Sequence, residues 1–218
     1  YFQQTARYNL NLNYRYEDAA GNVLNVDADY GWFNKDNSNL QSNLYTNAQG
    51  IPLQQNRYRT FNGIDIPLKA VKLDYTAPLW GGVAETGAKF SSIQSGNAAD
   101  FYHVLPRGDS LDNRRSNTFS FGEDITAAYV AYKKALGKWS VQGGLRMEQA
   151  SSAGTLSFQK NGADTSQVTK RNQLKLFPSF SVSVKPSANH NYSLSYSKRI
   201  DRPAYQDLNP FVLLDELS

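Results

Sequence analysis

Cysteine is absent from this chain of 218 residues, and histidine occurs only twice. Without thiols the chain has neither a disulfide framework nor a thiolate metal site. His103 and His190 lie far apart in the sequence, with no ligand-like spacing around either of them. We therefore expect no metal site and no cofactor.

Long hydrophobic runs are also missing. The chain is 40% hydrophobic, its mean hydropathy is -0.58, and no stretch approaches the roughly 18 apolar residues that a membrane-spanning helix requires. Low hydropathy does not exclude a membrane β-barrel, because a barrel strand presents only every second side chain to lipid and so has a low average hydropathy.

The chain also lacks a large excess of one sign of charge, and it lacks the common catalytic motifs. The net charge is +4, no basic run exceeds two residues, and no Gly-x-Ser-x-Gly motif occurs. Glu123 and Asp124 are adjacent carboxylates in a predicted strand, where neighbouring side chains point to opposite faces. Carboxylates that act as an acid–base pair must converge. We therefore predict neither a nucleic-acid partner nor an enzyme.

The chain is rich in aromatic residues and in alternating patterns. It contains 14 Tyr and 11 Phe. In residues 6–17 Tyr and Leu alternate with Asn and Arg, and related patterns recur in residues 23–34, 66–79, 83–94, 119–134, 139–150, 171–185 and 192–200. A period of two predicts strands with two unlike faces. Asn and Arg along a whole face suit a water-filled lumen, so we predict that the other face contacts lipid.

The predicted lipid-facing residues include Leu10, Val26, Leu73, Val141, Val182 and Leu194. One strand leaves its facing open: in residues 119–134 the favoured outward set is Ala128, Val130 and Tyr132, and the competing set is Ile125, Ala127 and Tyr129. Pro178 lies inside another predicted strand, where the loss of an N–H donor predicts a β-bulge.

The predicted connections alternate between short turns and long polar loops. Loops 35–63, 95–118 and 151–170 join strands two to three, four to five and six to seven, and the first of them leaves room for the end of a strand. A transmembrane barrel has short turns on its periplasmic side and long loops outside. The sequence therefore predicts an all-β fold: an antiparallel transmembrane β-barrel, built as a meander of about eight strands that forms part of a larger barrel. A closed eight-stranded barrel is the lesser alternative.

Five blocks together resemble one family in order and spacing. They read YNLNLNYRYEDAAGNVLNVDADYGWF, LKAVKLDYTAPLWGG, AAYVAYKKALGKWSVQGGLRMEQ, LFPSFSVSV and SYSKRIDRPAYQDLNPF. The chain is similar to the outer-membrane barrels of TonB-dependent receptors of the Bacteroidetes type. The resemblance implies the Gram-negative outer membrane and import of a bulky nutrient powered through TonB. It also implies, as partners, outer-membrane lipid, TonB acting through a plug domain, an unknown substrate and a surface lipoprotein.

We expect residues 1–218 to be a single barrel segment of a longer polypeptide, because neither a plug nor a signal peptide occurs and both ends look cut. Two other function classes remain. The first is an outer-membrane barrel with a structural or adhesive role and no transport. The second is a secreted soluble β-sandwich.

Two groups of residues are candidates for contact with a ligand or the lumen. Arg199, Asp201 and Arg202 follow the last predicted strand, and Arg114 and Arg115 form a basic pair near Asp109 and Asp112. We favour structural ion pairing for the first group and solvated loop charge for the second.

Charged residues of both signs are predicted to face inward. They are Arg15, Asp27, Asp29, Lys72, Asp74, Glu85, Lys89, Arg146, Glu148 and Lys175. A solute path would use such groups, but we favour cross-strand pairing along a wet inner wall.

Overall fold

The computed structural model describes residues 1–160 and 162–200. These residues form one antiparallel sheet of nine strands, in which chain neighbours pair in the order β1-β2-β3-β4-β6-β7-β8-β9 and β5 adds to β4. The strands are β1 (Phe2–Glu17), β2 (Val23–Thr46), β3 (Pro52–Leu79), β4 (Gly82–Leu105), β5 (Gly108–Leu111), β6 (Asn117–Leu136), β7 (Trp139–Lys160), β8 (Ala163–Ser187) and β9 (His190–Ser197). This is the predicted meander, with β5 as an addition. The described part of the chain contains no helix long and apolar enough to span a membrane.

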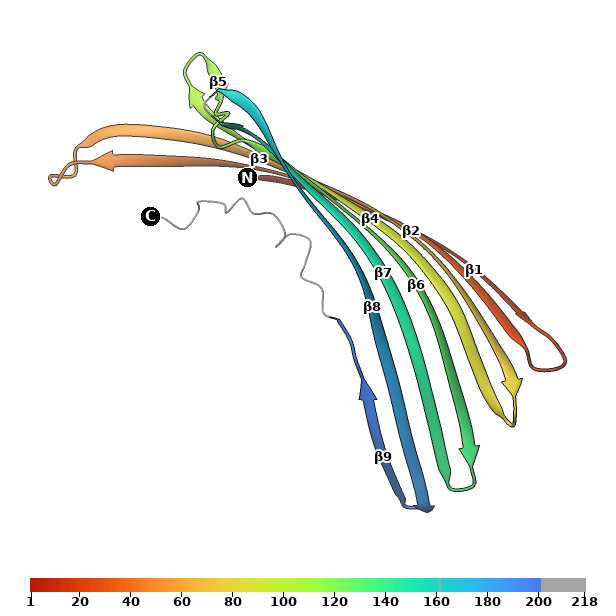
Figure 1. Cartoon of the computed structure of the whole chain (residues 1–218). Helices are drawn as coiled ribbons and strands as arrows, with labels where there is room; N and C mark the ends of the chain where they lie inside the picture. The colour runs from red at the N-terminus through yellow and green to blue at the C-terminus, as the bar shows by residue number, and fades with distance from the viewer. Residues whose placement is uncertain (161, 201–218) are drawn as a thin grey trace.

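The sheet is a single curved layer (Figure 1). No second sheet packs on it within the described residues. The β-sandwich alternative is therefore wrong, because a sandwich buries the facing sides of two sheets. The sheet also stays open: β1 pairs only with β2 and β9 only with β8 in the described ranges. The closed eight-stranded barrel is wrong for the same reason.

The two faces differ as predicted. Leu10 and Leu194 are 69% and 72% exposed, Leu73 is 44% exposed, and Val26, Val141 and Val182 are half-buried. None of these six enters a core. We call the side that carries them the outer face. Their exposure in isolation is what a lipid-facing surface requires.

Every residue that is buried in the described ranges lies on the opposite side, the inner face. Examples are Ala70, Phe119, Ala127, Leu156 and Phe177. Each alternates with an exposed outer neighbour. Curvature crowds the side chains of the concave side and spreads those of the convex side, so the inner face is the concave one.

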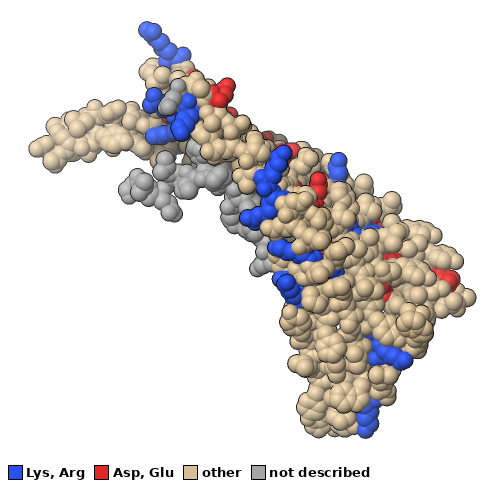
Figure 2. Space-filling model, viewed as in Figure 1, with Lys and Arg blue, Asp and Glu red and all other residues tan. Residues whose placement is uncertain are grey.

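Outward apolar side chains form a band that begins at the end with the short turns, at the bottom and right of Figure 1. The band comprises mainly alternate residues of 8–16, 24–32, 71–79, 128–136 and 174–184. These lengths match the roughly 9–11 residues of a tilted membrane-spanning strand. In the face that Figure 2 shows, Lys and Arg side chains gather mainly in the middle of the sheet and at its upper end, and a few reach the end with the short turns.

The strands are staggered relative to this band. One row of paired residues runs from Tyr16 through Leu24 and Tyr75 to Val130 and Pro178. Tyr16 stands next to its turn, whereas Pro178 lies well inside β8. Each hairpin therefore extends further than the last, as tilted barrel strands must.

The predicted long loops are wrong, since strands occupy most of them. β2 and β3 pair as far as Thr46 and Pro52, and β7 and β8 pair as far as Lys160 and Ala163. Beyond the band the outer face is mainly polar, although Leu40, Leu44 and Phe61 are exposed on it. The regular alternation of a lipid-facing strand therefore ends there, while the backbone ladder continues. Strand length is set by pairing as well as by side-chain pattern.

Two local predictions have different outcomes. Val130 is exposed and pairs with Leu145 on the outer face, which confirms the favoured facing of residues 119–134. The bulge at Pro178 is wrong, because β7 and β8 pair without a shift in register around it. The Pro178 carbonyl accepts a hydrogen bond from the Lys198 N–H. The missing N–H of Pro178 therefore points towards β9, where that strand ends, and the β7 ladder loses nothing.

The turn between β3 and β4 shows why the short connections are tight. Trp80 and Gly81 join the paired residues Leu79 and Gly82, and both have positive φ, 48° and 72°. Two such residues make the turn whose twist matches antiparallel strands. Trp80 is 81% exposed, as an aromatic residue at a membrane interface would be.

Candidate functional site

The inner face of the first strands carries a ladder of amide and carboxylate groups. Asn11 and Asn13 each donate a side-chain hydrogen bond to the carboxylate across from it, Asp29 and Asp27, and the Asn11 Nδ2 to Asp29 Oδ1 distance is 2.6 Å. These pairs face each other because β1 and β2 run antiparallel with both polar sets on one side. Both carboxylates thus already accept a hydrogen bond from the neighbouring strand of the wall.

Charged side chains further along the sheet are also paired. Asp74 forms an ion pair with Lys72 and accepts a hydrogen bond from the Tyr129 hydroxyl. The Arg146 Nε lies 2.7 Å from Glu148 Oε1. Both ion pairs join residues two apart in one strand, which share a face. This supports the favoured interpretation of the inward charges as groups that stabilise the wall.

Further from the short turns the inner face becomes apolar. We call this surface the inner apolar patch; it consists of Phe33, Ile64, Ile66, Leu68, Ile93, Phe119, Phe121, Leu156 and Phe158. Phe119 and Leu156 are paired across β6 and β7 and are each 5% exposed. In β6 and β7, apolar side chains therefore lie on the outer face within the band and on the inner face beyond it.

Sequence reasoning missed this patch, although a signal exists. In β6 the apolar residues Phe119 and Phe121 hold odd positions and Val130 and Tyr132 hold even ones. The change of phase marks the level at which the strand leaves the apolar band. It also explains why the facing of that strand was ambiguous in the sequence.

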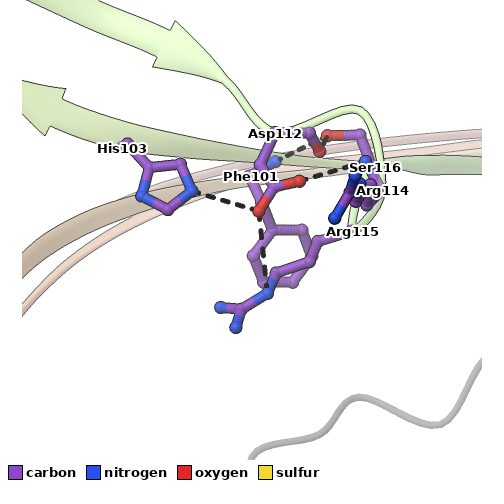
Figure 3. Close-up of polar contacts among 6 residues, drawn as sticks. All are labelled: Phe101, His103, Asp112, Arg114, Arg115 and Ser116. Carbon is purple, nitrogen blue, oxygen red and sulfur yellow. Dashed lines mark hydrogen bonds and ion pairs between the residues drawn. The ribbon is translucent and has the colours of Figure 1, made fainter. Parts of the chain in front are cut away.

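A polar cluster lies at the long-hairpin end, where β4, β5 and the start of β6 meet (Figure 3). Asp112 organises it: Oδ1 accepts the Arg114 backbone N–H at 3.0 Å, and the backbone carbonyl accepts the N–H groups of Arg115 and Ser116. The Ser116 hydroxyl in turn accepts the Phe101 N–H at 3.0 Å. The turn is therefore tied to β4.

Two side chains bring positive or potentially positive charge to Asp112. His103 Nε2 lies 3.1 Å and Arg115 Nε 3.7 Å from Asp112 Oδ2 (Figure 3). Burial on its own would raise the pKa of the Asp112 carboxyl. The Arg114 N–H hydrogen bond, with the hydrogen bond and charge of His103 and the charge of Arg115, outweighs burial and lowers that pKa below its ordinary value.

The cluster also reaches the neighbouring hairpin. The Tyr58 ring on β3 meets the His103 ring edge-on at 5.2 Å between centroids, and the Arg115 guanidinium lies 5.6 Å from the centre of the Tyr58 ring. Arg59 forms an ion pair with Asp109 on β5. These contacts hold the β5 hairpin against the long β2–β3 hairpin.

The structure separates the predicted basic pair. Arg115 is held by Asp112 and Tyr58, whereas the Arg114 side chain is exposed and has no ion pair among the described residues. Asp109 forms an ion pair with Arg59 instead of with either arginine of the pair. Arg199 is exposed beyond the end of β9. Asp201 and Arg202 lie outside the described residues, so the predicted network around Arg199 stays a prediction.

The comparisons with known proteins agree on the architecture. Residues 5–216 match the model of a family described as the outer membrane protein beta-barrel family. No curated protein matches the sequence.

Solved structures are similar in fold. The crystal structure of the ferric yersiniabactin uptake receptor FyuA from Yersinia pestis has a TM-score of 0.63 and 11% identity, over 88% of this chain and 27% of that one. The open form of the ferric-catecholate import receptor Fiu from E. coli K12 has a TM-score of 0.68 and 10% identity, over 89% of this chain and 35% of that one. This chain therefore spans about a quarter to a third of the length of these receptors and shares the fold of part of each.

Proposed function

The chain belongs to the outer membrane protein β-barrel family and lies in the outer membrane of a Gram-negative bacterium, and we propose that it forms part of the wall of a receptor that imports a bulky nutrient. Energy for import would come through TonB, acting on a plug domain inside the barrel. The titles of the similar structures name uptake and import receptors. The blocks ending in RIDRPAYQDLNPF favour the Bacteroidetes type.

The division of the inner face into two zones carries the proposal. At the level of the apolar band, the inner face is polar and its charges are paired, as at Lys72 and Asp74. Beyond the band it offers the inner apolar patch around Phe119 and Leu156. A patch that faces the lumen at the outer end of the barrel is placed to contact a large ligand before it passes inward.

The open edges support the same proposal. β1 and β9 each lack a second partner among the described residues, and unpaired edges do not persist in a membrane. We infer that further strands of a longer polypeptide close the barrel, and that residues 1–218 are one segment of it. A plug and a surface lipoprotein would be additional parts of the assembly.

Growth of bacteria on limiting nutrients tests the proposal. Cells without the gene are compared with cells that carry the wild-type gene or the Phe119→Asp variant. The nutrients tested are ferric chelates, cobalamin and oligosaccharides. Import predicts that growth on at least one of them needs the wild-type gene and fails with the variant.

The alternative of a structural or adhesive barrel gives the opposite result. Loss of the gene would then leave growth on every nutrient unchanged and would lower resistance to detergent or adhesion to surfaces. Immunoblots of outer-membrane fractions show whether the variant is present at wild-type level.

A further inference from the structure

Across the described residues 37–62, the inner face of the β2–β3 hairpin carries no charged side chain. This part of the hairpin reaches beyond the inner apolar patch, and its tip lies at the left of Figure 1. The side chains that share the face of Phe33 and Ile64 there are amides, with two tyrosines and one threonine. We call them the hairpin amide surface, which consists of Asn37, Asn39, Gln41, Asn43, Tyr45, Gln54, Asn56, Tyr58, Thr60 and Asn62.

Positive charge in the same segment lies mainly on the opposite face. Arg57 and Arg59 hold odd positions on β3, which point to the outer face. Two cations come near the hairpin amide surface. Arg115 is already held by Asp112, and Lys35 lies one row nearer the apolar band. An anionic ligand would therefore meet little positive charge on this surface.

Three buried acceptors lie where the hairpin amide surface meets the inner apolar patch. The side-chain oxygens of Asn37, Asn97 and Asn117 accept no hydrogen bond among the described residues. Asn37 and Asn117 belong to one cross-strand row, which crosses β3 and β4 at Asn62 and Ala99. Neighbouring strands are about 4.8 Å apart, so this row extends roughly 14 Å from Asn37 to Asn117.

The unpartnered acceptors indicate a ligand that donates hydrogen bonds. A buried acceptor without a donor is unfavourable, and the terminal torsion of asparagine is soft, so each amide can turn towards the lumen. An ammonium ligand would also donate. A cation that loses its water needs an anionic partner, however, and the hairpin amide surface contains no carboxylate. The surface therefore favours a neutral donor such as a hydroxyl group.

The tyrosines add an apolar contact to the polar ones. Tyr45 is 50% exposed, Tyr58 is half-buried, and Asn39 and Gln41 are exposed between them on the same face. An aromatic ring offers an apolar face that packs on the C–H side of a sugar ring. Amides both donate and accept hydrogen bonds, as sugar hydroxyls do. Amides and tyrosines together thus match both sides of a sugar.

We propose that the hairpin amide surface binds a neutral oligosaccharide before it enters the lumen. The sugar hydroxyls bond to the amides of β2 and β3, and sugar rings pack on Tyr45 and Tyr58. The inner apolar patch is the next part of the wall along these strands. This inference names the substrate class of the proposed importer and rests on that function, but binding is measurable without transport.

Binding of glycans by the isolated protein tests the proposal. The full-length protein is extracted in a detergent without a sugar headgroup, labelled with a fluorophore and applied to an array. The array carries neutral glucans, mannans, xylans and galactans together with uronate-containing oligosaccharides of the same length. We expect binding to at least one neutral oligosaccharide. Binding to none of them, or tighter binding to the uronates, would overturn the proposal.

Two adjacent pairs of variants locate the binding. Gln41→Ala and Tyr45→Ala change the inner face, whereas Ser42→Ala and Leu44→Ala change their outer neighbours. Leu44 is the matched control for Tyr45, because the two are 58% and 50% exposed. Each inner variant should bind the tightest neutral oligosaccharide about three- to tenfold more weakly, the range for one lost contact, and the outer variants should bind like the wild type. Equal losses on the two faces, or wild-type binding in both inner variants, would contradict the proposal.

The growth assay separates this inference from the import proposal. Glycan binding to the isolated protein, with growth unchanged by loss of the gene, would leave the binding surface in place and refute import. Growth on a ferric chelate or cobalamin that needs the gene, with no binding to any neutral oligosaccharide, would leave import in place and refute this inference.

Discussion

The Tyr129 hydroxyl donates a hydrogen bond to the carboxylate of Asp74, a residue 55 positions earlier in the sequence. β4 lies between their strands, and its residue in that row is Gly87. The Tyr129 side chain therefore crosses a strand at the one position where no side chain stands in its way. This contact ties three strands of the inner face together.

Substitution of Gly87 tests that arrangement. A Cβ at Gly87 would lie 2.7 Å from Asp74 Oδ1, the Leu73 carbonyl and Tyr129 Cε1. We expect Gly87→Ala to lower the free energy of unfolding by about 1–3 kcal/mol, measured by urea unfolding in detergent. Gly96→Ala is the control on the same strand, since its added Cβ meets nothing within 4 Å. Equal stability of the two variants would show that Tyr129 does not cross Gly87.

The contribution of the hydrogen bond between Tyr129 and Asp74 to the free energy of unfolding can be measured. Tyr129→Phe should cost about 1.5 kcal/mol, the low end for a bond to a charged group, because Asp74 keeps its ion pair with Lys72. A double-mutant cycle with Asp74→Ala isolates the coupling between the two side chains. Independent effects of the two substitutions would contradict the contact.

Like charges face each other at Lys72 and Lys89 on neighbouring strands. Lys72 is compensated by Asp74, but Lys89 faces Ala127 on its other side. Lys89→Gln should therefore raise the free energy of unfolding by about 0.2–1 kcal/mol. Lys175→Gln is the contrast, because Lys175 faces Glu148 and its loss should destabilise. Changes of the same sign in both variants would argue against pairing along the inner wall.

The tip cluster should respond to acid. The pKa of Asp112 is lowered from its ordinary value of 3.8, so the folded turn favours the carboxylate. Its contribution to stability is present above 3.8 and is lost as the pH falls through the lowered pKa. Hydrogen exchange at Arg114, Arg115 and Ser116 measures this. In Asp112→Asn the amides should be less protected than in the wild type at neutral pH. Equal protection there would mean that Asp112 does not organise the turn.

The face on which each side chain lies could be predicted, because side chains alternate between the two faces with a period of two along every strand. Leu10 and Leu194, at opposite ends of the chain, both follow the alternation and are both exposed on the outer face. The strand ends could not be predicted in the same way. Beyond the apolar band, residues such as Asn37 and Asn62 pair across β2 and β3 although their composition is typical of loops.

The candidate site depends on information that the local pattern does not hold. The contact of Asp74 with Tyr129 requires the register of three strands, which pairing across the sheet determines. Arg114 and Arg115 are adjacent in sequence and looked like one basic pair. They have different surroundings because only Arg115 lies near Asp112 and Tyr58.

Residue-by-residue accessibility tests the central claim, that the outer face touches lipid and the inner face touches water. The described chain has no cysteine of its own, so single cysteines at Leu145, Arg146 and Met147 on β7 report without background. In outer membranes, a water-soluble maleimide should label the cysteine at position 146 and spare those at 145 and 147, while a lipid-soluble reagent does the reverse. Equal labelling of all three, or the opposite alternation, would contradict the account.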